Sequence, residues 1–522
     1  MKILLSVLLA GVLMASAVPV FASGETDKTD VKQPLVGVIR WDAYGATNEK
    51  SKLSVPDQVA RTLSYYYGQA PYYAVKRETP DGDITLAFEN LYEKTGLTYT
   101  LDSVKKLDLS PETVKYTYGV SWEEEAVLAL DAGVDYFATV FYNDGDIMAL
   151  PRKAHVATNG MVPDGRQMGL VWILEHGRLG TDSKFAQKDT EEKQFRAIPL
   201  DRRQLYQGMA QSCYVCLPGE TRVPVLMCMH ANQYSAEELA FMKAEALFCT
   251  AYYEKINPEK YKHADDVYFI GMQCEVMTEK NVAAYKGTGF TALSRYSSWP
   301  DFTEGDEEPM TRYLYNDIIR KNGEEITVIS RPYTDLIKVD QKYNHSYLPH
   351  MGKTAFIPLV SLGLSHVPRI KTGVKWTGDY GRRYYRVGTV EERAQNVAAI
   401  RKMVMDYPAL NPLHTMLIYA WNEHDEGGYL CPTIKVDETG QPLYNTDGSF
   451  QKDTSLIDAV RDVLTAQTDA TPAPTNGPDV TQAPASPDAP NAKAGCGSAV
   501  SMAAILPAAV GSAVLLKKKK EN

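Results

Sequence analysis

Eight short apolar runs, rich in β-branched residues and bounded by turn residues, recur between residues 33 and 466. Runs of this length and composition are typical of buried strands. Stretches with a helical pattern lie between several of them, and alternation of strand and helix predicts a parallel sheet. The runs occupy residues 36–41, 134–141, 169–174, 223–229, 267–272, 290–293, 355–360 and 416–421.

Eight nearly continuous apolar strands fit a closed (β/α)8 barrel of the TIM type better than an open α/β sheet, which stays the alternative. Helical patterns at residues 122–131, 236–255 and 390–405 support the alternation. The connections after the first and sixth runs are long, and such βα connections carry lids and binding loops. The first contains Tyr65-Tyr66-Tyr67, aromatic residues of a kind that can stack on sugars, although packing is their commoner role.

The two ends of the chain predict export and attachment to the cell surface. Residues 1–22 combine Lys2, an apolar run and a small-residue cleavage pattern, as a secretion signal does. Residues 467–494 are rich in Pro, Ala, Thr and Asp and predict an unfolded linker. Residues 495–522 contain an uncharged run, 498–516, followed by four lysines, which predicts a transmembrane or cell-wall anchor. We therefore expect an extracellular (β/α)8 domain over residues 33–466.

Charge and cysteine spacing argue against nucleic acid as a partner, a disulfide framework and a metal site. The net charge of −10 argues against nucleic acid as a partner. The seven cysteines show no disulfide framework. Cys213 and Cys216 form one CxxC without a second Cys or His pair, so we expect neither a metal site nor a cofactor. The acidic trio at residues 123–125 is typical of a solvated helix face.

The catalytic residues of such barrels lie where the strands end, and glutamates follow three of the predicted strands. Glu175 closes the third run, Glu275 follows the fifth, and Glu423 and Glu426 follow the eighth. Glycoside cleavage needs one carboxylic acid to protonate the leaving oxygen and a second carboxylate as nucleophile or base. These four are the candidate catalytic residues. The candidate substrate-binding residues at the strand ends are Arg40, Trp41, Asp42, Tyr44, Tyr142, His176, His366, Trp421, Asn422 and Asp425.

The segment Trp421-Asn422-Glu423-His424-Asp425-Glu426-Gly427-Gly428 resembles the WNEW-x-EG segment of glycoside hydrolase family 99-like and WbsX-like proteins. The first run, residues 36–45, and residues 356–369 are similar to other parts of the same barrel. The resemblance implies a TIM barrel and retaining, endo-acting hydrolysis of a glycan, in the best-understood members α-mannosides, without a metal. It also implies that Asn422, Glu423 and Glu426 line the sugar site. His424 departs from the usual Trp, and no HxEPY-type segment is found, so the catalytic pair stays open.

The leading hypothesis is a cell-surface glycoside hydrolase in which Glu423 or Glu426 works with Glu175 or Glu275. A non-catalytic glycan-binding protein on the same barrel is the alternative. A glycosyltransferase-associated role, suggested by the WbsX-like proteins, fits less well because nucleotide sugars are scarce outside the cell. Carbohydrate is the expected partner in the first two.

Overall fold

The computed structural model describes residues 33–44, 59–60, 62–64, 66–78, 84–88, 110, 113–114, 119–142, 147–177, 188–298, 315–321, 324–372 and 383–466. The expected signal, linker and anchor segments lie outside these residues. No helix within the described ranges is both long enough and apolar enough to cross a membrane.

Every one of the eight predicted runs forms a strand of one sheet, and all neighbouring strands in it are parallel. In chain order the strands are β1 (Leu35–Arg40), β4 (Tyr136–Val140), β5 (Gly169–Glu175), β6 (Val225–Met229), β7 (Tyr268–Met272), β8 (Ala292–Ser294), β11 (Ala355–Phe356) with β12 (Leu359–Ser361), and β14 (Thr415–Tyr419).

The seventh run closes the sheet on itself. Its first half, β11, pairs with β8, and its second half, β12, pairs with β14 on the other side. Between them, the Ile357 N–H donates to the Leu293 carbonyl, and the Pro358 carbonyl accepts from the Leu417 N–H. Because one run bridges both edges, the sheet is an eight-stranded parallel barrel, and the open-sheet alternative is wrong.

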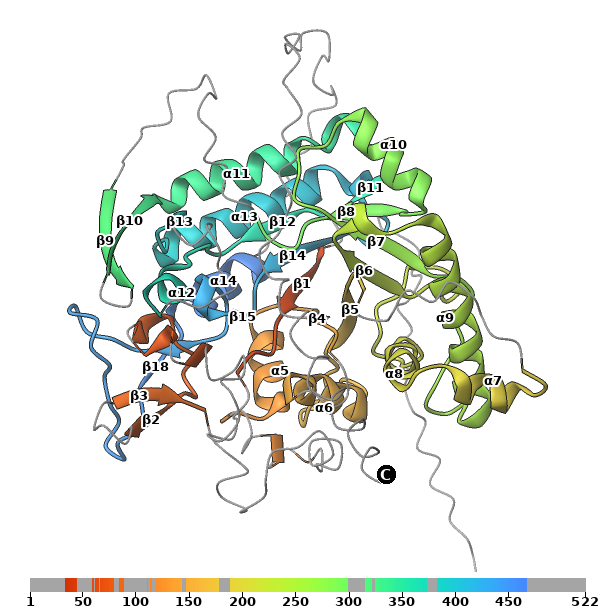
Figure 1. Ribbon diagram of the computed structural model, residues 1–522, viewed down its shortest axis with the longest axis horizontal. Coiled ribbons are helices and arrows are strands. Elements are labelled where there is room, and N and C mark those ends of the chain that lie inside the picture. The colour runs from red at the N-terminus through yellow and green to blue at the C-terminus, as the bar shows by residue number, and fades with distance from the viewer. Residues whose placement is uncertain are drawn as a thin grey trace, which may run out of the picture. The chain divides into compact units, whose positions relative to one another are not determined.

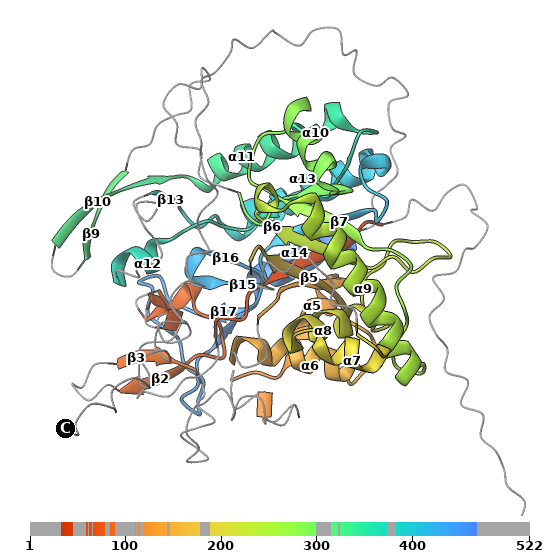
Figure 2. The ribbon, with the colours of Figure 1, turned by 45° about the vertical axis from the view of Figure 1, so that its right-hand side comes forward.

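Helices follow the strands and surround the barrel (Figures 1 and 2). Several begin at capping boxes, in which Ser121, Ser235 and Thr389 accept from a backbone N–H three residues on. These caps start the three predicted helices. The helices are α5 (Trp122–Asp131), α6 (Leu150–Thr158), α7 (Glu191–Ala197), α8 (Leu200–Met209), α9 (Ala236–Ile256), α10 (Glu279–Thr288), α11 (Tyr333–His345), α12 (Val367–Thr372), α13 (Val390–Asp406) and α14 (Ser455–Thr465).

Small additional sheets lie in the connections that follow the carboxyl ends of the barrel strands. β2 (Val75–Glu78) and β3 (Ile84–Ala87) lie in the connection after β1. β9 (Tyr315–Lys321) and β10 (Glu324–Arg331) follow β8, and β13 (Arg383–Tyr385), which follows β12, pairs with β10. Both hairpins lie on one side of the barrel, together with α12 (Figures 1 and 2). The described parts of the two long insertions therefore border the carboxyl end of the barrel, where part of the site is built.

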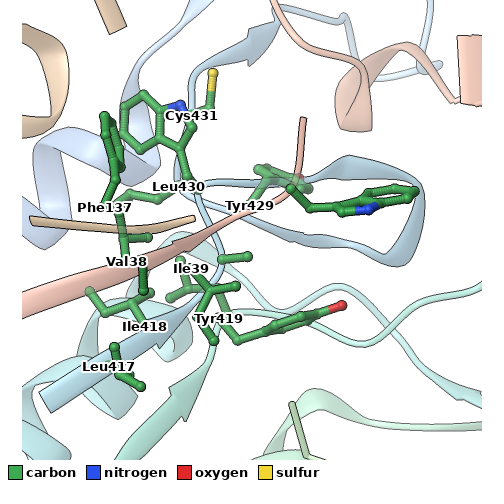
Figure 3. Packing of buried hydrophobic residues seen from close by; sticks show 14 of the residues in the cluster. Val38, Ile39, Phe137, Leu417, Ile418, Tyr419, Tyr429, Leu430 and Cys431 are labelled. Atoms are coloured by element: carbon green, nitrogen blue, oxygen red, sulfur yellow. The ribbon is translucent and has the colours of Figure 1, made fainter. Parts of the chain in front are cut away.

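Successive side chains along the barrel strands point alternately outward, to a layer under the helices, and inward, to the barrel interior. Leu170 and Trp172 of β5 pack in one cluster with helix residues such as Leu205 and Met242, so this face lies under the outer helices. Val171 belongs to the other cluster and faces the barrel interior. Figure 3 shows the region where β1 and β14 meet, with the side chains of Val38, Ile39, Phe137, Leu417, Ile418, Leu430 and Cys431 near one another and the Tyr419 ring pointing away from Phe137 and Cys431.

Candidate active site

The connection after β14 turns back on itself and holds three acids in the barrel mouth. β15 (Asn422–Glu423) pairs antiparallel with β16 (Gly428–Tyr429), and the turn between them is the short helix η7 (His424–Glu426). Gly427 ends η7 with a φ of 73°, a conformation that favours glycine. The backbone N–H groups of residues 430 and 431 return to the Trp421 carbonyl. This turn buries Glu423, Asp425 and Glu426 to 4% exposure or less.

Arg369 of α12 binds all three of these acids. Its Nε donates to Asp425 Oδ2 at 2.6 Å, and its Nη1 donates to Glu426 Oε1. Its Nη2 lies 3.9 Å from Glu423 Oε2. The guanidinium also lies 5.6 Å from the centre of the Trp41 ring. One buried cation therefore lies against every acid of this turn.

Glu426 is held as the charged carboxylate. Burial would raise its pKa, but the charge of Arg369, the nearby His366 and hydrogen bonds from Tyr419 and Arg369 outweigh burial and lower the pKa. His366 Nδ1 lies 3.8 Å from Glu426 Oε1, and burial lowers the pKa of this imidazole. Arg369 is therefore the main source of positive charge beside Glu426.

The surroundings of Glu423 favour its neutral form. Burial raises its pKa well above the ordinary value, and the negative charge of Glu426 adds to the effect. Arg369 and the hydrogen bond from the Tyr296 hydroxyl to Glu423 Oε1, 2.6 Å long, oppose the rise without cancelling it. The Tyr296 ring packs edge to face against Tyr419, which binds Glu426. The pKa values of the two glutamates in this turn are thus shifted in opposite directions, as those of acid and base partners in active sites are.

Four residues of the mouth lie next to this pair. The Trp41 indole N–H donates to the Tyr142 hydroxyl, and the Trp41 backbone N–H donates to Asn422 Oδ1 at 2.8 Å. Asn422 Nδ2 lies 3.4 Å from Asp42 Oδ1. Burial raises the pKa of Asp42 to about 6, although its ion pair with Arg40 acts against the rise. The structure brings these predicted residues together with the carboxylates, through the end of β1.

Arg40 lies behind the mouth. Its Nη2 donates to Glu125 Oε2 of α5 at 2.5 Å, and Glu125 Oε1 accepts from the Trp421 indole at 2.8 Å. The expectation that the trio at residues 123–125 is a solvated face is therefore wrong for Glu125, which is 2% exposed. The helix turns this third acid inward, and it joins α5 to the barrel. Arg40 and Trp421 support the site from behind, and we assign them no contact with substrate.

Tyr44 and His424 fix the acidic turn from the side. The Tyr44 hydroxyl accepts from the His424 backbone N–H at 2.9 Å. The His424 imidazole stacks on Tyr429 and contacts the Gln69 carbonyl through Nδ1 at 2.8 Å. Burial lowers the pKa of His424 to about 3, so it is neutral. Both side chains position the turn from within the protein.

The remaining predicted residues divide between the barrel interior and its rim. Glu175 is 5% exposed and shares the inward face of β5 with Val171. Glu275 accepts from the Tyr285 hydroxyl of α10, and His176 lies 3.4 Å from Glu238 of α9. These contacts direct Glu275 and His176 toward the outer helices, so we keep only Glu175 as a third candidate carboxylate.

From the sequence, Arg369 and Tyr296 were polar residues beyond strand ends without an assigned role, and Tyr419 was not selected. Arg369 and Tyr296 stand just beyond predicted strands, where polar residues gather in such barrels, so their positions carried a weak signal. Tyr419 lies within the last apolar run and gave none. Among the described residues, no group of three or more His, Cys, Asp or Glu could hold a metal ion.

No family model and no curated protein matches this chain. Among solved structures, the chain is similar to the GH99 endo-alpha-mannosidase from Bacteroides thetaiotaomicron. In the complex of that enzyme with Bis-Tris-propane, the TM-score is 0.38 at 11% identity, over 82% of this chain and 95% of the other. A second structure of the enzyme gives 0.37 at 11% identity, over 83% and 98%. At these values the likeness does not establish membership of that family.

Proposed function

We propose that this protein is a glycoside hydrolase that uses Glu423 as the acid and Glu426 as the carboxylate. The observation that carries the proposal is the placement of two buried glutamates in one turn, with Tyr296 hydrogen-bonded to Glu423 and Arg369 paired with Glu426; their pKa shifts run in opposite directions. A neutral carboxylic acid and a carboxylate, placed together at the mouth of a (β/α)8 barrel, are the two groups that glycosidic cleavage requires.

In this mechanism, Glu423 gives its proton to the leaving oxygen of the glycosidic bond. Glu426 forms a bond to the anomeric carbon as the bond to the leaving oxygen breaks, and water then releases the sugar with Glu423 acting as base. This is a retaining reaction. Trp41, Tyr142, Asn422 and Asp42 form the wall nearest the pair and would bind sugar hydroxyls and ring faces. We further propose an endo-acting enzyme that is exported by the N-terminal signal and anchored outside the cell by the C-terminal segment.

The test is incubation of the purified protein with α-mannans, N-glycans and plant and fungal polysaccharides, following reducing ends and product masses. We expect defined oligosaccharides from the wild type. Glu423→Gln and Glu426→Gln should each lose at least about 100-fold in kcat, whereas Glu259→Gln, at an exposed position on the outer surface, should behave as the wild type. Full turnover by both active-site variants would refute the assignment.

A glycan-binding protein without turnover is the second candidate. Arg369 contacts all three acids of the turn. A carboxylate that is paired with an arginine can accept hydrogen bonds from sugar hydroxyls without acting as a nucleophile, which suits a binding protein. Tight binding of a glycan without release of products would favour this function. Glu175, the third inward carboxylate, then becomes the residue to substitute in a test for residual turnover.

A further inference from the structure

A buried polar network joins the two connections that carry Tyr296 and Arg369. Its centre is Asp340 of α11, whose side chain is fully buried. The Ser298 hydroxyl, beyond β8, donates to Asp340 Oδ1. The Ser361 N–H, at the end of β12, donates to Asp340 Oδ2 at 2.7 Å. One carboxylate thus ties the connection after β8 to the connection after β12.

On the β8 side, the network holds the chain on both sides of Tyr296. Arg295, which directly precedes this tyrosine, is fully buried, and its Nη1 donates to Ser298 Oγ at 2.6 Å. Its Nη2 donates to Asn344 Oδ1 of α11 at 2.9 Å and lies 3.7 Å from Asp340 Oδ1. These contacts fix the backbone from which the tyrosine hydroxyl reaches its carboxyl partner in the acidic turn.

On the β12 side, the network holds the chain that borders the acidic turn. The Ser361 hydroxyl donates to Asp340 Oδ1 at 3.1 Å, and Asn396 Nδ2 of α13 donates to Asp340 Oδ2 at 3.1 Å. Both helices lie beside β12 (Figure 1). A Cβ at Gly363 would lie 2.0 Å from the Gly427 carbonyl oxygen, so the chain touches the turn at this point. The same connection then supplies the arginine that binds the acids of the turn.

We infer that Asp340 is a positioning residue, which keeps the Tyr296 hydroxyl on Glu423 by fixing the connection after β8 against the connection after β12. A buried hydrogen bond is costly to leave unmade, so the two connections can separate only when bonds of Asp340 are lost. The part of Glu423 in catalysis rests on the proposed function, but its hydrogen bond and its titration do not need turnover. The groups that face Glu423 are Tyr296, Arg369, Asp425 and Glu426.

The test is a carboxyl-carbon NMR titration of protein labelled at its glutamates, in which the signal lost in Glu423→Gln identifies Glu423. Ser298→Ala removes the link between the β8 connection and Asp340. Because the bond from Tyr296 lowers the pKa of Glu423, we expect this pKa to rise by about 0.5 to 1 in the variant. Thr250→Val, which removes a fully buried hydroxyl of the outer helix α9, is the matched control and should leave the titration unchanged.

A Tyr296→Phe background separates positioning from a general loss of stability. No hydroxyl remains to be positioned in this background, so Ser298→Ala should no longer change the titration of Glu423. Asp340→Asn also removes a charge, and the effect of that charge through space is present in both backgrounds. The difference between the backgrounds is therefore the positioning effect of Asp340, and we expect it to have the same sign and size as that of Ser298→Ala.

An unchanged pKa of Glu423 in Ser298→Ala, or an equal rise with and without the Tyr296 hydroxyl, would overturn the inference. Ser298→Ala removes a single oxygen atom and keeps the test decisive if Asp340→Asn does not fold. Release of reducing ends from glycans, measured on the same proteins, tests the proposed function separately. A titration that depends on Ser298 in a protein without turnover keeps the positioning role and rejects the hydrolase, and turnover with a titration independent of Ser298 does the reverse.

Discussion

Replacement of Arg369 by Gln tests the electrostatic design of the acidic turn. The variant leaves Glu426 and Asp425 without the cation that binds them, all within a region that is 4% exposed or less. Removal of one partner from a buried ion pair typically costs about 3–5 kcal/mol of unfolding free energy. We expect a loss of this size at pH 7. Arg369→Lys keeps the charge but not the planar fork, so its loss should be smaller.

The pH dependence has a definite sign. In the wild type the pKa of Glu426 lies below the 4.5 of the unfolded chain, so its contribution to stability is present above pH 4.5 and is lost as the pH falls through the folded pKa. Without Arg369, burial dominates and raises the pKa of Glu426, and the charged form then destabilises the fold as the pH rises above 4.5. The difference between the wild type and the variant should therefore be larger at pH 7 than at pH 5.

Urea unfolding followed by tryptophan fluorescence at both pH values measures these differences. Arg461→Gln is the control, because Arg461 is 44% exposed and pairs with Asp458 and Asp462 on α14. An exposed pair of this kind contributes about 0–1 kcal/mol. The reasoning is refuted if Arg369→Gln costs no more than Arg461→Gln, or if its cost at pH 5 equals or exceeds that at pH 7.

Three further predictions concern the same turn and its support. Glu423→Gln should stabilise the fold at pH 7, because the raised pKa of Glu423 is a cost of burying its charged form, whereas Glu426→Gln should destabilise it; unfolding of both variants under one condition checks the opposite signs. Tyr296→Phe removes a hydrogen bond that lowers the pKa of Glu423, so the alkaline limb of the pH–kcat/KM profile should move to higher pH. Glu125→Ala should cost about 3–5 kcal/mol, measured by urea unfolding, because it leaves Arg40 buried beside a single remaining carboxylate.

The acidic turn lies at a connection that meets two neighbouring connections of the barrel. β14 lies between β1 and β12, so the chain that leaves it can meet residues from both neighbouring connections. Trp41 and Asp42 come from the end of β1, and Arg369 comes from the connection after β12. A carboxylate pair at this point can therefore be tuned by side chains from both of its neighbours.

The sequence by itself determined where the strands and the three capped helices lie. A buried strand needs a continuous apolar run and a helix start needs an oxygen for its free N–H groups, and both requirements are met by residues close in sequence. Glu423, Glu426 and Asn422 were predicted for the same kind of reason, because they follow directly from the end of a predicted strand. The eight-stranded architecture followed from the count of the runs.

Tertiary structure alone decided how the barrel closes and what charge each acid carries. The split of the seventh run into β11 and β12 depends on two partners at once, and neither pairing is visible in its own residues. Arg369 reaches Glu426 across 57 residues of chain, and Glu125 turns inward although its two acidic neighbours do not. A pKa depends on burial and on charges within a few ångströms in space, and local sequence specifies neither of these quantities.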